Sequence, residues 1–540
     1  MHLVFLNQYY PPDAAPTGVM LEGLVEGLLR DGHEVSVLCA VGGYAGKTQD
    51  KKTQGTRQEE EANIEHRTPN AQRRTKEDCG CEPRRIAQAP QTTDHGQPST
   101  LPTHLKLRII RIGASKFGRG SFAGKLMDYA SYYVGVALKL LTLRPRPDRI
   151  VALTTPPYLS LLARLMSKWR GADHAHWVMD VYPDVLAAHG MLSEQSLAYR
   201  LLAALARWGM GGKRCAAILT LGPDMAERVG GRVVSGPLSV VSDCGSEPRL
   251  DAQAPQTTDP RQPTTVTWVP LWGTGMGRVV SGPLSVVGDC GTDLRLDAQA
   301  PQTTDHRQPT TLPQALALRR ARGWGDTDLV VMYSGNMGLG HRFGEILAAA
   351  GGGERVVCCP LSVVGDCGSE PRHGAQAPPT TDHRQPTTLP LRFVFFGGGK
   401  RRDEVAKFAE THPAADIELH DYAPADQLLA HLQSADVHIA SLEPAWSGTM
   451  VPSKLQGIFA ASRPVIFIGS AESSIGRWVL ESGGGWVVAA GDVGGLLEAL
   501  EHARDPGERA CRGRAAKEFA EEHFDQHRNV ARVAAILTGR

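Results

Sequence analysis

The stretch that decides the fold spans residues 448–469 and reads GTMVPSKLQGIFAASRPVIFIG. A helix is predicted to begin after Ser453, whose hydroxyl is suited to cap the unpaired N–H groups of a first turn. The helix is predicted to end before Pro464, because proline has no N–H to donate. The apolar run that follows, Val465–Ile468, indicates a strand of a parallel sheet that is covered on both faces.

The start of this helix predicts an anion site. Its free N–H groups and positive helix end favour a negatively charged ligand. Lys454, one residue into the helix, adds a mobile charge that suits phosphate. The alternative is an ordinary capped helix with a solvated lysine, since helix N-termini are common.

The run P-S-K, the helix, the turn A-A-S-R-P and the strand resemble the nucleotide-sugar half of glycosyltransferase family 4. The resemblance implies two Rossmann-like domains in the GT-B fold, transfer with retention of anomeric configuration, and a role in bacterial surface polysaccharide synthesis. Three positions depart from the family. Ser462 stands where glycine is usual, and Thr449 and Gly457 stand where many members carry a pair of glutamates. The ribose and sugar contacts of those glutamates must then come from elsewhere or be missing.

Further segments of the C-terminal half are predicted to hold the donor. The strand at residues 328–334 leads into a glycine loop, a phosphate-binding arrangement, and Y-S-G-N-M-G resembles the family's donor loop. The strand at 391–396 ends in G-G-G-K-R, where glycine permits close approach and a cation can hold phosphate. The strand at 436–442 ends at Glu443. The predicted donor-binding residues are Gly335, Asn336, Gly338, Gly399, Lys400, Arg401, Glu443, Ser453 and Lys454, with Gly18 of the N-terminal half.

The N-terminal half opens with a βαβ pattern. A strand at residues 2–7 precedes a loop, a helix at 19–30 and a second strand at 35–38. The loop therefore lies at the carboxyl end of the first strand, where ligands bind in such sheets. Gly18 permits close approach of a ligand at the helix start, and the resemblance implies that this loop faces the donor diphosphate and the acceptor. The alternative is a glycine that only serves a turn.

The catalytic candidates lie on and after the strand at residues 175–179. Asp180 opens the segment D-V-Y-P-D at the carboxyl end of this strand, and W-V-x-D-x-Y-P is close to the family pattern. The alternative for Asp180 is an N-cap or structural aspartate. Alternation places His174 and His176 on one face, opposite Trp177. His176 is the second catalytic candidate, although a strand histidine is more often structural.

Composition limits the classes of function. The chain has 540 residues and a net charge of +1, so nothing indicates a nucleic-acid partner. The N-terminus lacks the features of a signal peptide, and no apolar run reaches the roughly 20 residues of a membrane span. We expect a cytoplasmic protein, or one that is peripheral on the inner face of the membrane. Outside the repeats described below, Cys39, Cys215 and Cys511 show no metal-ligand spacing, so neither a metal nor a cofactor is expected.

A helical segment at residues 115–143 carries both basic and aromatic residues, among them Lys116, Arg119, Tyr132 and Tyr133. One reading is an amphipathic helix that packs on its own sheet. The other is a surface that docks on lipid headgroups, where a lipid-linked acceptor would lie.

Four segments are copies of one unit with the pattern DCG…AQAP…TTD…QPTT, at residues 78–102, 232–265, 278–313 and 355–390. Their irregular spacing excludes a solenoid, and they are poor in residues that form a core. The simplest account is a coding element inserted in frame at surface loops, where insertion costs little. The alternative is an interaction module used four times.

The predicted fold class is α/β, with two Rossmann-like domains in the GT-B arrangement that face each other across a ligand cleft. Residues 1–272 form the acceptor-side domain, with irregular insertions at 47–103 and 232–265. Residues 273–540 form the nucleotide-sugar domain, with insertions at 278–313 and 355–390. The last helix is expected to pack back on the first domain.

The expected function is retaining, metal-independent transfer of a sugar from a nucleotide diphosphate sugar to a lipid-linked or polysaccharide acceptor. A nucleotide-sugar epimerase or dehydrogenase needs a G-x-x-G-x-x-G or G-x-G-x-x-G motif after the first strand, and residues 8–18 contain neither. The non-enzymatic alternative is a degenerated transferase kept as a scaffold, or a pseudogene product, which the residues at 449, 457 and 462 favour.

Overall fold

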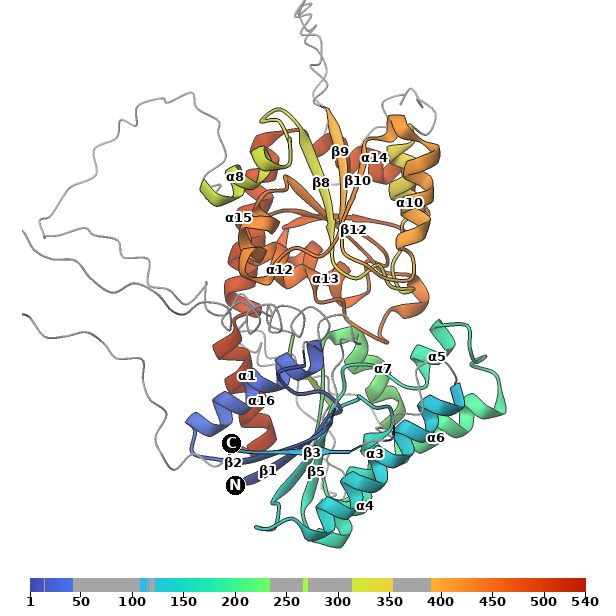
Figure 1. The fold of residues 1–540 in the computed structure, drawn as a ribbon, viewed down its shortest axis with the longest axis vertical. Coiled ribbons are helices and arrows are strands. Elements are labelled where there is room, and N and C mark those ends of the chain that lie inside the picture. The colour runs from blue at the N-terminus through green and yellow to red at the C-terminus, as the bar shows by residue number, and fades with distance from the viewer. Residues whose placement is uncertain are drawn as a thin grey trace, which may run out of the picture.

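The computed structural model describes residues 1–13, 15–41, 107–113, 115, 122–233, 266–270, 313–352 and 390–540. Two parallel sheets with helices packed on their faces occupy separate lobes (Figure 1). This confirms the predicted α/β architecture of two sheets. Nearly all of the insertion at 47–103 and of the four copies lies outside the described residues.

The first sheet has the strand order β3-β2-β1-β4-β5-β6-β7, and every neighbouring pair is parallel. Alternate residues of β1 enter two cores, with Leu3 and Phe5 in one and Val4 and Leu6 in the other. The apolar run of the strand is thus explained by burial on both faces. The elements are β1 (His2–Leu6), α1 (Pro16–Arg30), β2 (Glu34–Ala40), β3 (Leu107–Ile112), α3 (Phe122–Thr142), β4 (Arg149–Ala152), α4 (Leu159–Arg170), β5 (Asp173–Trp177), α5 (Asp184–Ala188), α6 (Leu197–Met210), β6 (Cys215–Thr220), α7 (Pro223–Val233) and β7 (Val266–Trp268).

The second sheet has the order β10-β9-β8-β11-β12-β13, again with parallel neighbours throughout. The elements are α8 (Pro313–Ala321), β8 (Leu329–Ser334), α9 (Gly344–Ala350), β9 (Leu391–Phe396), α10 (Arg402–Thr411), β10 (Ile417–His420), α11 (Leu428–Gln433), β11 (Val437–Ser441), α12 (Lys454–Ala460), β12 (Val465–Ile468), α13 (Ser474–Ser482), β13 (Gly485–Val488), α14 (Val493–His502), α15 (Pro506–His523) and α16 (Gln526–Thr538), with short 3₁₀ turns η1 (Pro413–Ala415), η2 (Ala425–Gln427) and η3 (Pro444–Trp446).

Some predicted boundaries are wrong at the edges of the copies. Arg232 was predicted to open the second copy, yet it belongs to α7, where its guanidinium forms an ion pair with the buried carboxylate of Asp184. Pro313 was predicted to close the third copy, yet it is the first residue of α8. Strand β7 ends at Trp268, close to the predicted domain boundary at residue 272, and pairs with β6 of the first sheet. Helices α7 and α8 therefore include residues that the repeat pattern assigned to the copies.

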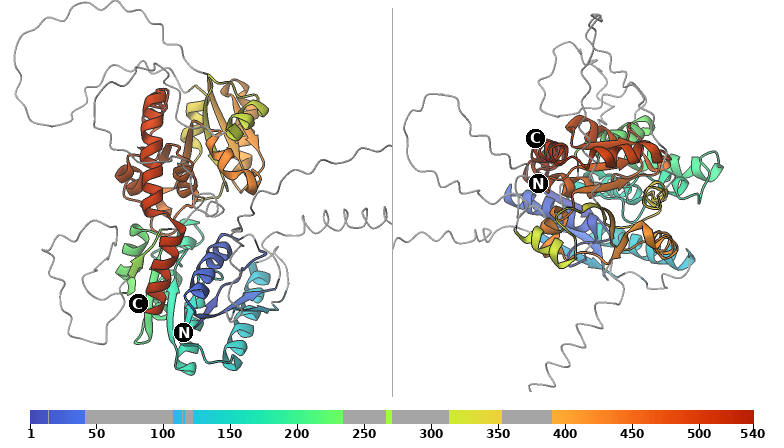
Figure 2. Two further views of the ribbon diagram at one scale, coloured as in Figure 1. Left: turned by 90° about the vertical axis from the view of Figure 1, so that its left-hand side faces the viewer. Right: turned by 90° about the horizontal axis from the view of Figure 1, so that it is seen from above.

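The two lobes are held together by the end of the chain and by α7. Helix α16 lies beside α1 of the first lobe (Figures 1 and 2). On the other side, the Asp224 carboxylate of α7 accepts from the Gly448 N–H at 2.9 Å, and Arg477 of α13 pairs with Glu227 at 2.7 Å. The first contact holds the loop after β11 against α7, and the second holds α13 against the same helix.

Candidate active site

The order of the second sheet reverses between β8 and β11, which is where an open parallel sheet binds ligands. Residues 335–341 leave the carboxyl end of β8, and Glu443 follows β11. The loop after β9 packs beside the loop after β8. The Met337 N–H donates to the carbonyl of Gly398 at 2.7 Å, and the Arg401 N–H donates to the carbonyl of Met337 at 3.0 Å. The structure thus brings the predicted donor loops to one edge of the sheet.

Two of the predicted glycines are required by backbone conformation and by space. Gly335 has φ +134°, and a Cβ there would lie 2.7 Å from Cε of Lys454. Gly399 has φ +133°, and its Cβ would lie 2.6 Å from Oδ1 of Asn336. Gly338 is also close to Asn336, since its Cβ would lie 3.2 Å from Nδ2. These glycines let the loops close on one another and on Lys454.

The ammonium of Lys454 lies in a small polar network behind these loops. Its Nζ is 3.0 Å from Nε2 of His341, whose Nδ1 is 2.7 Å from the carbonyl oxygen of Ser441. Because a carbonyl can only accept, Nδ1 carries the proton and Nε2 accepts from Lys454. Nζ also lies 4.9 Å from the centre of the Tyr333 ring. No carboxylate pairs with Lys454 in the described part of the chain, so this cation is available to an anionic ligand.

Desolvation changes the protonation of this network. It lowers the pKa of Lys454 to about 7, although the side chain keeps partial contact with solvent. Desolvation, with the nearby charges of Lys454 and Arg401, lowers the pKa of His341 to about 3. The histidine is therefore neutral at physiological pH. The lysine is divided between its two forms, and a phosphate beside it would favour the charged form.

Glu443 is held between two arginines of the donor edge. Its carboxylate lies 2.7 Å from Arg342 and 3.6 Å from Arg401. Arg342 also pairs with Glu345 at 2.6 Å, and Arg401 pairs with Glu404 at 2.7 Å. Glu443 therefore orients guanidinium groups of this edge. Sequence reasoning missed Arg342 because only the tertiary fold brings it to Glu443.

Lys400 and Ser453 are exposed members of the predicted donor set, as are Asn336 and Gly399. Burial lowers the pKa of His189 in the first lobe, and the charge of Lys400 lowers it further. The Lys400 ammonium therefore acts electrostatically on a residue of the other lobe. Ser453 immediately precedes α12, but its side chain makes no capping hydrogen bond among the described residues. Its φ of −81° and ψ of 6° are not the extended angles that capping requires. The predicted cap at Ser453 is therefore wrong.

Asp180 contacts the second lobe through its backbone. It follows β5 and forms an antiparallel β-bridge with Met450. The next N–H, of Val181, donates to the carbonyl of Thr449 at 2.9 Å. Burial raises the pKa of the Asp180 carboxyl to about 6. The backbone of Asp180, at the carboxyl end of the first sheet, thus lies against the loop that leads into α12 and Lys454.

A small cavity lies beside Asp180, with a volume of about 40 Å³. His176 lines the same cavity, but its ring is only 2% exposed. Strand alternation was predicted correctly, since the rings of His174 and His176 lie on one face with centroids 5.0 Å apart. Burial lowers the pKa of His176 well below its usual value. Because the ring is closed off from solvent, Asp180 is the better placed of the two catalytic candidates.

Gly18, Thr449 and Gly457 are packed closely against other parts of the chain. A Cβ on Gly18 would lie 3.2 Å from the backbone carbonyl of Tyr9, so the missing side chain leaves room for the chain's own loop. Thr449 is fully buried and donates to the carbonyl of Trp446 at 2.7 Å, so it cannot replace a sugar-binding glutamate. At Gly457 a Cβ would lie 3.2 Å from Cδ1 of Leu432.

The fold was compared with known proteins. No protein-family model and no curated protein matches the chain. Among solved structures, WaaG, a glycosyltransferase involved in lipopolysaccharide biosynthesis, matches with a TM-score of 0.52 and 14% identity over 100% of both chains. Anabaena HepE in complex with UDP matches with a TM-score of 0.52 and 11% identity over 100% of both chains. A trehalose-6-phosphate structure from E. coli bound with UDP-2-fluoro glucose matches with a TM-score of 0.55 and 11% identity over 99% of each chain.

The chain has the GT-B fold. Its second sheet carries the predicted donor residues at the β8–β11 switch point, and its first sheet carries Asp180 at the contact between the lobes. At these identities the likeness shows the fold alone, so the activity is argued from the site.

Proposed function

We propose that the chain is a glycosyltransferase that moves a sugar from a nucleotide diphosphate sugar to a saccharide or lipid-linked acceptor in cell-surface polysaccharide synthesis. The proposal rests on the position and, in the described part of the chain, the missing carboxylate partner of the Lys454 ammonium. This desolvated ammonium stands at the switch point of the second sheet, against Gly335 and His341, without a carboxylate partner among the described residues. An unpaired cation held by a neutral histidine is suited to an anion such as a diphosphate. The UDP and UDP-sugar in the complexes of two proteins with this fold are ligands of this class.

The proposed chemistry needs positive charge on the donor side and an oriented hydroxyl on the acceptor side. As the bond from the sugar carbon to the diphosphate breaks, negative charge grows on the leaving oxygens, where Lys454 and Arg401 stabilise it. Asp180 accepts a hydrogen bond from the acceptor hydroxyl and orients it toward the sugar carbon. The hydroxyl proton passes to a leaving phosphate oxygen as the new bond forms on the same face. This route retains the anomeric configuration and uses no metal.

An exposed apolar surface of the first lobe is suited to bind a membrane that holds a lipid-linked acceptor. Helices α3, α4 and α6 are neighbours in the first lobe (Figure 1). On α6, Leu197, Leu201 and Leu205 recur at every fourth residue and are 81%, 60% and 38% exposed, and the exposed basic residues Arg200 and Arg207 lie on the same helix. An apolar patch with basic residues suits the anionic headgroup region of a membrane. We therefore place the enzyme on the inner face of the membrane. None of the helices in the described part of the chain is long and apolar enough to span a bilayer.

Part of the predicted basic-aromatic surface does not belong to this patch. Tyr132 of α3 is 1% exposed, and its hydroxyl donates to the carbonyls of Asn7 and Leu38 at 3.0 Å each. It anchors the helix to the sheet, as the amphipathic alternative predicts. Lys116 and Arg119 lie outside the described residues.

Vesicle cosedimentation tests the membrane assignment. The chain should sediment with vesicles that contain anionic phospholipid and much less with neutral ones, and Leu197→Ser with Leu201→Ser should abolish this. Leu480→Ser on α13 is the matched control, because Leu480 is 60% exposed on the other lobe. Equal sedimentation of the double variant and the control would contradict the assignment.

A thermal-shift screen of UDP- and GDP-sugars tests the transferase function, because a ligand that binds only the folded state raises the melting temperature. A donor that stabilises the protein should then be hydrolysed slowly, or transferred to an added acceptor. Failure of every nucleotide sugar to bind would support the inactive-scaffold alternative, which the replacements at Thr449, Gly457 and Ser462 favour. Nuclear magnetic resonance of the product's anomeric centre distinguishes retention from inversion.

A further inference from the structure

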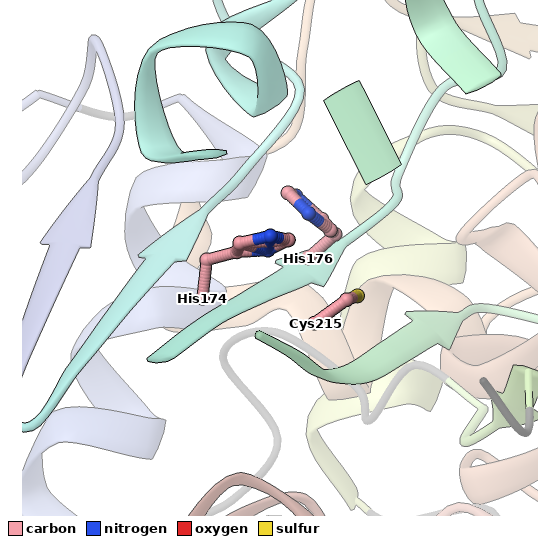
Figure 3. Close-up of side chains that lie close together, drawn as sticks. All are labelled: His174, His176 and Cys215. Atoms are coloured by element: carbon pink, nitrogen blue, oxygen red, sulfur yellow. The ribbon is translucent and has the colours of Figure 1, made fainter. Parts of the chain in front are cut away.

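Three potential metal ligands meet inside the first sheet. His174 and His176 project from β5, and Cys215 begins the neighbouring strand β6 (Figure 3). One donor atom from each lies within 4.8 Å of the others. The cysteine lies far from the histidines in sequence, so no ligand spacing revealed the group.

A β-bulge creates this arrangement. His174 is paired with Cys215, whereas His176 is paired with Ile218, so the register shifts between His174 and Ala175. In a regular parallel pair that kept His176 opposite Ile218, Cys215 would point to the opposite face of the sheet. The bulge turns the thiol to the face that carries both imidazoles. Bulges are found where a sheet re-aims a functional side chain.

The group is buried and its polar atoms are poorly satisfied. The relative exposures are 1% for His174, 2% for His176 and 1% for Cys215. Both ring nitrogens of His176 and Nδ1 of His174 have no hydrogen-bond partner among the described residues. An unpaired buried polar atom lowers the stability of the fold by about 1–3 kcal/mol. Three unpaired ring nitrogens close together therefore favour a bound ligand. The Cys215 thiol has only a long contact, 3.9 Å from the carbonyl of Ala217.

We propose that His174, His176 and Cys215 bind Zn²⁺. Two neutral imidazoles and a thiolate are ligands that zinc prefers, and three protein ligands with one open position is a known form of zinc site. The cavity beside His176, of about 40 Å³, has room for a water molecule as the fourth ligand. On binding, the thiol proton leaves to solvent and the sulfur takes the place of a hydration water. The charged groups nearest the cluster are Arg164, Arg149 and Asp173. The aspartate partly offsets the two arginines.

The ion would link β5 to β6 just before the loop of Asp180, and so hold that loop against the second lobe. It plays no part in neutralising the leaving diphosphate, which the proposal for donor binding assigns to Lys454 and Arg401. The metal site and the transferase function are therefore separate claims.

Spectroscopy of the Co²⁺-substituted protein tests the site, because thiolate ligation gives an intense ultraviolet charge-transfer band. The cysteines of the copies must first be removed from the full-length chain, since they would bind the same metal. The parent protein for this experiment has serine at positions Cys79, Cys81, Cys244, Cys290, Cys358, Cys359 and Cys367.

This parent should bind about one equivalent of Co²⁺ with a charge-transfer band, and Zn²⁺ should displace it and raise the melting temperature. Cys215→Ser and His176→Gln should each abolish the band and the Zn²⁺-dependent rise. Cys39→Ser and Cys511→Ser should keep both. Donor affinity, measured without metal, separates this claim from the transferase function. No band in the folded parent, or a band that survives in Cys215→Ser, would overturn the proposal.

Discussion

Asp180 and Met450 form an antiparallel β-bridge that joins the carboxyl end of the first sheet to the loop before α12. The adjacent hydrogen bond, from the Val181 N–H to the Thr449 carbonyl at 2.9 Å, extends the contact. The catalytic candidate of one lobe and the donor lysine of the other are thus connected through a short piece of backbone. A shift of the loop in either lobe would change the distance between the two groups.

Asp180→Asn should lower turnover at least about tenfold, because orientation of a reacting group contributes several kcal/mol to catalysis. Donor affinity should change by no more than a few-fold, since Asp180 is assigned to the acceptor. Steady-state kinetics and donor calorimetry measure the two effects separately. Asp31→Asn, an exposed turn residue, is the control. Normal turnover in Asp180→Asn would make Asp180 a purely structural residue.

Donor affinity should fall as the pH rises from about 7 to 8. The pKa of Lys454 is lowered to about 7 in the free protein, so the amine is charged below this pH and must take up a proton on binding above it. The expected loss approaches tenfold for each pH unit above the pKa. Calorimetry in buffers of different ionisation enthalpy should show proton uptake at pH 8. Lys454→Arg, which stays charged, should bind with little pH dependence. A steep pH dependence in that variant would assign the effect to another group.

Ser462→Gly should stabilise the protein by up to about 1 kcal/mol, because the left-handed backbone costs a residue with a side chain about 1–2 kcal/mol, partly offset by glycine's greater freedom in the unfolded chain. Ser462 has φ +57° within the turn that follows α12. Urea unfolding measures the difference. Ala461→Gly, at φ −77°, should instead destabilise the protein. If both variants lose stability, strain at Ser462 is not relieved by glycine.

Removal of residues 278–311 and 355–389 should leave a folded protein with unchanged donor affinity. This excision keeps Pro313, which begins α8, and Pro390, whose carbonyl accepts from the Leu329 N–H at 2.8 Å. The removed sequence is poor in large apolar residues, so its removal forfeits little burial. Loop-closure entropy changes by only about 0.6 kcal/mol for each doubling of length. Limited proteolysis of the intact chain should cut within these segments first. Aggregation of the shortened chain would support the interaction-module alternative.

The sequence predicts much of this fold because each prediction rests on local chemistry. Apolar runs placed β1, β8, β9 and β12 correctly, and the strand–glycine-loop pattern located the loops at Gly335 and Gly399. The alternation of His174 and His176 was also predictable, since it depends only on the period of a strand.

The rest depends on contacts between distant parts of the chain. Arg342 contacts Glu443 only because of the order of the strands in the second sheet. Cys215 lies close to the two histidines only because of the β-bulge between β5 and β6. The close packing of Gly18 against the Tyr9 backbone is likewise not visible in the sequence. The cap at Ser453 failed because residue preference does not fix the backbone angles that capping needs.

The proposed function depends on binding of the diphosphate of a nucleotide sugar by Lys454. Calorimetric titration of the donor found by the thermal-shift screen, at pH 6.5 into wild type and Lys454→Ala, tests it most directly. The variant should bind the donor at least about tenfold more weakly, because a charge-assisted contact is worth about 1.5–3 kcal/mol. Lys407→Ala, which removes an exposed lysine of α10, should bind like wild type. Equal donor affinity in wild type and a folded Lys454→Ala protein would show that Lys454 does not bind the donor diphosphate.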